Sequence, residues 1–154
     1  MKLNFDGTSL IQMKQSKTWD IHGWVLWAAW TCISLLQIFT NRYMKHWYRS
    51  HQLMHTVLGL ASLGLTSYGF WIAFVQRRKR IVWTYHPICG LILIVMAILL
   101  TLGGMCANLK RKCVNHDWNS KGYASSGKVH GVCAYFVIFF SQVTISMGIC
   151  VYWS

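Results

Sequence analysis

Four long apolar runs constrain this chain more than any other feature of its sequence. They cover residues 24–40, 53–75, 81–105 and 129–153, and none of them contains Asp, Glu, Lys or Arg. A helix that crosses the hydrocarbon core of a bilayer needs about 20 consecutive apolar residues, so the first run requires its flanks and the other three suffice alone. Short connections predict that neighbouring helices are antiparallel. We therefore expect an all-α, integral membrane four-helix up-down bundle over residues 21–154, preceded by a polar tail at residues 1–20.

The charged residues lie between these runs. The formal net charge is +12, from 15 Lys and Arg against 3 acidic residues. So basic a chain suggests nucleic acid, but cations that flank apolar helices contact lipid headgroups, so we expect membrane lipid as a partner and no nucleic acid. Seven cations fall on the side of the two termini and eight on the other. The orientation therefore stays open, as does the choice among plasma, endosomal and mitochondrial inner membranes.

Histidines lie near the start of every apolar run. His22 precedes the first, His51 and His55 begin the second, His86 is early in the third, and His130 begins the fourth. In an antiparallel bundle the first and third helices start at one face and are diagonal across the core, and the second and fourth do the same at the other face. His22 is therefore predicted to meet His86 at one depth. His51 or His55 is predicted to meet His130 at the other.

Two histidines that approach from opposite sides of a bundle axis have the arrangement of haem axial ligands. Spacing therefore predicts two haems between the helices, one in each leaflet. It does not choose between His51 and His55, which lie four residues apart on one helical face. The ordinary alternative for any one of these histidines is a partly solvated interfacial residue, although ionisable groups inside membranes are usually functional. Zinc is disfavoured because no carboxylate or thiolate lies at a matching depth.

Four short motifs resemble the cytochrome b561 family, especially its four-helix core of the type that often follows a DOMON domain. They read HGWVLWAAW from His22, NRYMKHWYRSH up to His51, HPICG from His86 and HGVCAY from His130. The resemblance covers about residues 20–153. It implies a cytochrome b561-like domain with two b haems, whose iron ligands are His22, His51, His86 and His130. The family ligand follows a Trp-aromatic-x-x sequence, here WYRS, which favours His51 over His55.

The resemblance also implies a function, namely electron transfer across the bilayer. The hydrocarbon core is about 30 Å thick, and two staggered haems divide that path. The expected donor is a small reductant such as ascorbate, and the expected acceptor is ferric iron, monodehydroascorbate or a partner protein. If the chain is an enzyme, we expect an ascorbate-dependent or ferric reductase.

Other interpretations stay open at this point. Arg42 is a candidate contact for a haem propionate or an anionic donor, with a lipid-facing charge as the alternative. The chain is alternatively a haem-bearing or haem-free membrane subunit of a larger redox or respiratory complex, and a homodimer is also open. Better-known members of the family have six helices, with one more on each side of the core that this sequence resembles.

Overall fold

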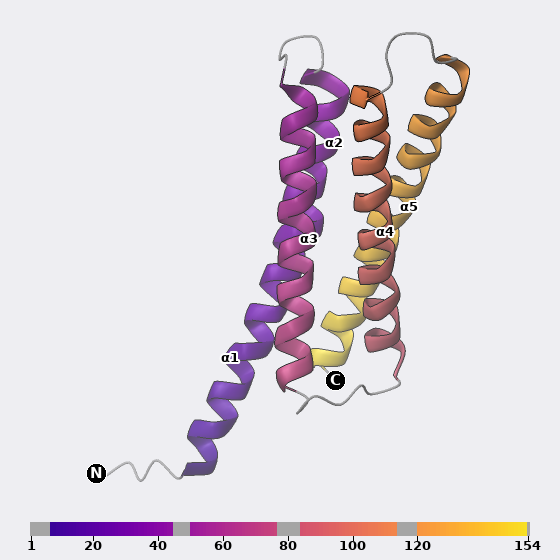
Figure 1. Cartoon of the computed structure of the whole chain (residues 1–154). Coiled ribbons are helices and arrows are strands. Elements are labelled where there is room, and N and C mark those ends of the chain that lie inside the picture. The colour runs from indigo at the N-terminus through magenta and orange to yellow at the C-terminus, as the bar shows by residue number, and fades with distance from the viewer. Residues whose placement is uncertain (1–6, 45–49, 77–83, 114–119, 154) are drawn as a thin grey trace.

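The chain folds into four long helices. The computed structural model describes residues 7–44, 50–76, 84–113 and 120–153. The first long helix is continuous and consists of α1 (Gly7–Trp27), the π-helical segment η1 (Ala28–Ile33) and α2 (Ser34–Tyr43). It is followed by α3 (His51–Gln76), α4 (Tyr85–Cys113) and α5 (Ser120–Trp153). The expectation of four long apolar helices is confirmed (Figure 1).

Each long helix contains a stretch that is long and apolar enough to cross a membrane. These stretches are Lys17–Tyr43, His51–Gln76, Tyr85–Cys106 and Gly127–Tyr152. The shortest has 22 residues, which at 1.5 Å per residue gives about 33 Å, against a hydrocarbon core of about 30 Å. The first begins at Lys17, so residues before the apolar run supply the missing length. The four helices are consistent with a multi-pass membrane protein.

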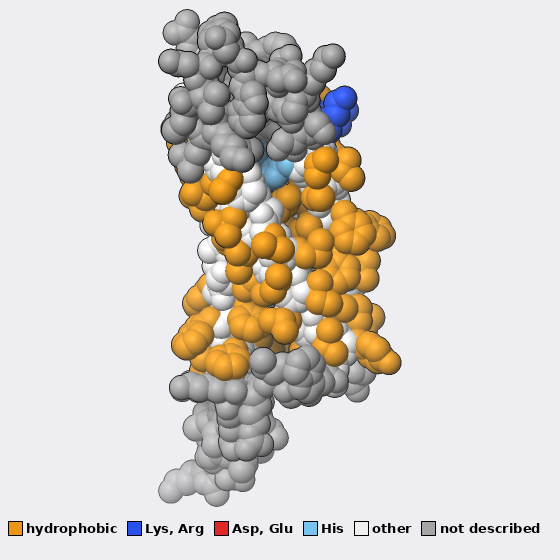
Figure 2. Space-filling view, turned by 45° about the vertical axis from the view of Figure 1, so that its right-hand side comes forward, with side chains coloured by type: hydrophobic (Ala, Val, Ile, Leu, Met, Phe, Trp, Pro, Cys, Tyr) orange, Lys and Arg blue, Asp and Glu red, His pale blue; other side chains and the backbone are white. Residues whose placement is uncertain are grey.

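Apolar side chains face outward and small polar side chains face inward. Trp24 is 68% exposed and Phe139 is 69% exposed, and Figure 2 shows hydrophobic side chains over the middle of the molecule. The buried polar residues are Ser34, Thr40, Ser62, Thr66, Ser141 and Thr144. This distribution suits a lipid solvent, because membrane helices pack through small and hydroxyl-bearing residues rather than through a hydrophobic driving force.

The helices pack as an up-down bundle, in which neighbours along the chain lie side by side. The helix α3 packs along α1, η1 and α2 on one side and against α4 on the other. The helix α5 packs against α4 and, near η1 and α1, against the first long helix. These neighbours leave the first long helix diagonal to α4, and α3 diagonal to α5. In Figure 1, α1 extends below the bundle and the C-terminus lies at the same lower end.

Two smaller points concern the ends of helices. The helix α1 begins at Gly7, so the described part of the N-terminal tail is helical and continues into the first span. The helix α3 begins after Ser50, whose carbonyl accepts the Met54 N–H at 3.0 Å. His51 is therefore the first residue of α3, and His55 lies one turn further into the bundle.

Candidate functional site

A first pair of histidines lies near the lower end of the bundle, where α4 begins. The ring centres of His22 and His86 are 6.4 Å apart and their planes are nearly perpendicular, at 87°. The Nδ1 of His22 bonds to the Gly69 carbonyl at 2.8 Å, and that of His86 bonds to the Thr144 carbonyl at 3.0 Å. A carbonyl oxygen only accepts, so both Nδ1 atoms carry a proton and donate it to the backbone. We call His22 and His86 the lower pair.

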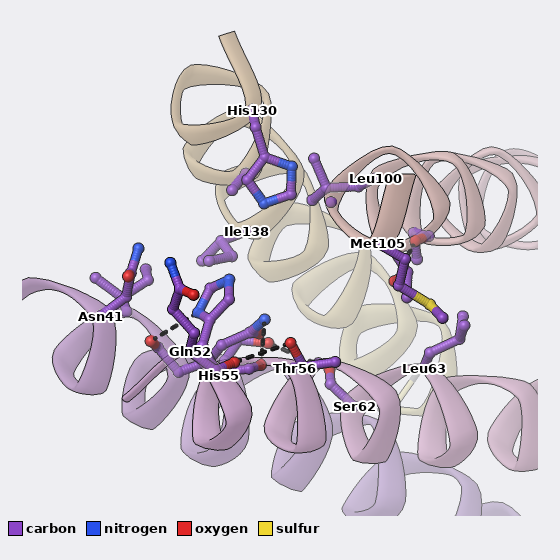
Figure 3. Close-up of a pocket in the computed structure, with 18 of the residues that line it drawn as sticks. Asn41, Gln52, His55, Thr56, Ser62, Leu63, Leu100, Met105, His130 and Ile138 are labelled. Carbon is purple, nitrogen blue, oxygen red and sulfur yellow. Dashed lines mark hydrogen bonds between the residues drawn. The ribbon is translucent and has the colours of Figure 1, made fainter. Parts of the chain in front are cut away.

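A second pair lies near the upper end, where α3 begins. The ring centres of His55 and His130 are 6.3 Å apart, with an interplanar angle of 71°. Figure 3 shows the two rings pointing toward each other from α3 and α5. His55 Nδ1 donates to the Gln37 carbonyl at 3.3 Å, and Gln37 Nε2 donates back to the His55 carbonyl at 3.2 Å. This two-way contact ties His55 to α2. We call His55 and His130 the upper pair.

Glycines allow the neighbouring helices to approach one ring of each pair. A Cβ on Gly148 would lie 2.7 Å from Cε1 of His86, and a Cβ on Gly104 would lie 3.0 Å from Cε1 of His130. Both distances are shorter than normal contacts between carbon atoms, which begin at roughly 3.5 Å. Sequence reasoning passed over both glycines. Glycine is nevertheless enriched where membrane helices approach each other closely.

The two pairs lie far apart along the bundle. The helix α3 carries His55 beside the upper pair and Gly69 beside the lower one, a rise of about 21 Å at 1.5 Å per residue. The helix α4 carries His86 in the lower pair and Gly104 beside the upper one, a rise of about 27 Å by the same measure. Each pair therefore lies toward one end of the membrane-crossing region.

Each pair borders a cavity. The upper cavity has a volume of about 260 Å³, and its wall includes His55, His130 and the polar side chains of Gln37, Asn41, Gln52, Thr56, Ser62 and Thr101. The lower cavity has a volume of about 110 Å³ and contains His22 and His86 among mostly apolar and aromatic residues such as Leu26, Phe70, Leu93 and Ile145. The upper cavity is thus larger and more polar.

Two residues singled out from the sequence lie elsewhere. His51 is half-buried and is not part of the wall of the upper cavity, where His55 takes the place opposite His130. Arg42 is exposed, and its Nη1 donates to the hydroxyl of Tyr135 at 3.3 Å. Its neighbour Asn41 lines the cavity, whereas Arg42 itself does not.

Cysteine and acidic side chains do not add to either pair. Within the described residues, no three His, Cys, Asp or Glu side chains converge on a position that could hold a metal ion. Among the side chains that the structure describes, the free thiols are Cys32, Cys89, Cys106, Cys133 and Cys150. Among the described His, Cys, Asp and Glu side chains, each pair therefore offers two imidazoles and no third ligand.

Comparisons with family models, curated proteins and solved structures find no match to this chain. Nothing in them identifies the chain as a member of the cytochrome b561 family. The resemblance of the four histidine motifs therefore remains an interpretation of the sequence, and the function has to be argued from the geometry of the two pairs.

Proposed function

We propose that the bundle binds two b haems, one between His22 and His86 and one between His55 and His130, and transfers electrons across a bilayer. The separation of the rings carries the proposal. Two imidazoles on opposite sides of one metal have ring centres about 6.3 Å apart, from about 2.0 Å between metal and nitrogen and about 1.15 Å between nitrogen and ring centre on each side. The observed values are 6.4 and 6.3 Å.

Three further observations support a metal group at each pair, and the first of them favours a haem. Each site offers two histidines, which is the number of protein ligands that a haem iron takes when the porphyrin supplies the other four. The Nδ1 bonds of His22, His86 and His55 to backbone carbonyls are the outer contacts that usually orient metal-binding imidazoles. Each pair also borders a cavity between diagonal helices.

The proposal assigns His55, not His51, to the upper pair. The sequence resemblance favours His51, whereas the described geometry favours His55, because the ring of His55 is the one found 6.3 Å from that of His130. The two residues are one helical turn apart on the same face. The choice between them is therefore open to a direct test by substitution.

In this mechanism the residues of the chain bind and orient the haems that carry the electron. When bound, each haem would supply one reversible one-electron couple. The histidines would hold it, the backbone carbonyls would orient the imidazoles, and the surrounding apolar helices would exclude water and set the potential. By the resemblance, the donor is ascorbate or a similar small reductant. The acceptor is ferric iron, monodehydroascorbate or a partner protein, and the chain acts alone or as a subunit of a redox complex.

An optical spectrum of the purified full-length protein tests the proposal. We expect reducible Soret and α bands and two b haems per chain, and partial reduction by ascorbate. His22→Ala or His86→Ala should leave one haem, and His130→Ala should leave the other. His55→Ala should remove the upper haem, while His51→Ala should retain both.

Two results would contradict this account. A native protein without haem bands after expression with sufficient haem would favour a haem-free membrane subunit. Loss of the upper haem in His51→Ala, with both haems kept in His55→Ala, would return the ligand assignment to His51. In each single variant the remaining haem serves as the control that the bundle has folded.

A further inference from the structure

Trp30 separates the upper and lower cavities and contributes to the wall of both. No other residue that the structure describes is shared between the two walls. The upper cavity extends from His55 and His130 to Trp30, and the lower cavity extends from His22 and His86 to the same residue. Its side chain is therefore the common boundary of two sites that lie about 21–27 Å apart along the helices.

The packing around Trp30 holds it in this central place. The side chain is 5% exposed and belongs to the small hydrophobic core formed with Ala29, Leu93, Ala97 and Val137. Its backbone carbonyl accepts Nε2 of Gln142 from α5 at 3.5 Å. The residue thus contacts the interior rather than lipid, unlike Trp24 and Trp27 on the same helix, which are 68% and 43% exposed.

The local backbone also fixes its position. Trp30 lies in the π-helical segment η1, where the Ser34 N–H bonds to the carbonyl of Ala29. The same carbonyl accepts the hydroxyls of Ser34 at 2.9 Å and Ser62 at 3.2 Å, so the wide turn is tied to α3. Single π-helical turns within α-helices occur often at functional sites. Here the turn carries the one side chain that both cavities share.

Packing alone does not explain an indole at this position. Trp30 Nε1 is buried and has no hydrogen-bond partner among the described residues. Buried indole N–H groups usually find an acceptor, and an unpaired one calls for an explanation. A phenylalanine ring would fill less of this space, but it carries no donor that would be left buried and unpaired. The indole N–H of Trp30 therefore carries a cost to stability that a phenyl ring would not have.

We propose that Trp30 is the bridge through which an electron passes between the two histidine pairs. This inference rests on the proposed function, since it requires a haem at each pair. One electron leaves the reduced site and enters the oxidised site, so one couple is oxidised and the other is reduced. Trp30 itself is neither oxidised nor reduced, and no proton moves. Its role is to provide a conjugated side chain between the two sites, where the electron would otherwise have to cross an open gap.

The test uses the full chain in sealed lipid vesicles. A membrane-impermeant photoreductant outside the vesicles delivers one electron to the near haem, and absorbance then follows its passage to the far haem. We expect transfer to become severalfold slower in Trp30→Leu and in Trp30→Met, and to stay closer to the native rate in Trp30→Phe. The matched control is Trp27→Leu, which changes a lipid-facing tryptophan one turn away and should transfer at the native rate.

Two further readouts separate a bridge from a structural support. Haem content and both midpoint potentials should be unchanged in the Trp30 variants. In the haem-free protein, Trp30→Phe should melt close to the native temperature, because removal of a buried, unpaired donor offsets part of the packing lost with the smaller ring. These readouts do not depend on electron transfer.

Three results would overturn the inference. The first is a native transfer rate in Trp30→Leu with both haems bound. The second is loss of a haem from both Trp30→Leu and Trp30→Met, which would make Trp30 a structural support. The third is equal slowing in Trp27→Leu. Failure of the proposed function itself is distinguishable, because it would appear as missing haem bands in the native protein.

Discussion

Gly148→Ala tests whether the close packing of α5 on His86 holds the lower pair. The new Cβ would lie 2.7 Å from Cε1 of His86 and 3.2 Å from both ring nitrogens. Carbon atoms pack at roughly 3.5 Å or more, so the ring must move by about 0.8 Å. A shift of that size breaks or lengthens the bond from Nδ1 to the carbonyl of Thr144, which is now 3.0 Å.

The expected change in stability is modest, because the helix propensity of alanine offsets part of the cost of moving His86. Alanine is favoured over glycine within a helix by about 0.5–1 kcal/mol. A lost hydrogen bond costs about 0.5–1.5 kcal/mol, and a strained rotamer of His86 costs a similar amount, about 0.5–1.5 kcal/mol. The free energy of unfolding should therefore fall by roughly 0–2.5 kcal/mol, and the helices should remain folded.

The effect on cofactor binding should be much larger, since a ligand displaced by about 1 Å no longer has productive geometry. We expect Gly148→Ala to lose the lower haem and keep the upper one, as measured by haem stoichiometry and by the reduced-minus-oxidised spectrum. Gly64→Ala is the matched control, because a Cβ there meets nothing within 4 Å. It should keep two haems. The reasoning is refuted if Gly148→Ala also keeps two haems with native spectrum and potentials.

Three other substitutions probe contacts of different kinds. Gly104→Ala places a Cβ 3.0 Å from Cε1 of His130. It should therefore lower the occupancy of the upper haem, but less than Gly148→Ala lowers that of the lower haem. Full occupancy of the upper haem in a haem assay would contradict this expectation. Ser62→Ala removes a 3.2 Å bond to the carbonyl of Ala29 and should lower the free energy of unfolding by about 0.5–1.5 kcal/mol, measured by denaturation in detergent. Tyr152→Phe removes an exposed 2.9 Å hydrogen bond to the carboxylate of Asp20. It should lower the free energy of unfolding by no more than about 1 kcal/mol in the same denaturation measurement.

Much of the architecture is encoded in local patterns. Four uncharged apolar runs leave little choice but four long helices, because a backbone in lipid must satisfy its own hydrogen bonds. Loop lengths then predict antiparallel neighbours. The same pattern predicted that His22 and His86, and His130 with a histidine of α3, would lie at matched depths. That prediction needed only residue counts along helices of fixed rise.

Tertiary packing decided the details that give the sites their shape. His51 and His55 share a helical face, so periodicity cannot separate them; the contact of His55 with Gln37 and the approach of α5 place His55 opposite His130. The π-helical segment η1 leaves no clear sequence pattern, yet it places Trp30 between both cavities. The physical reason is that helical periodicity specifies depth and face, whereas distances between helices depend on which side chains, or which glycines, meet at each crossing.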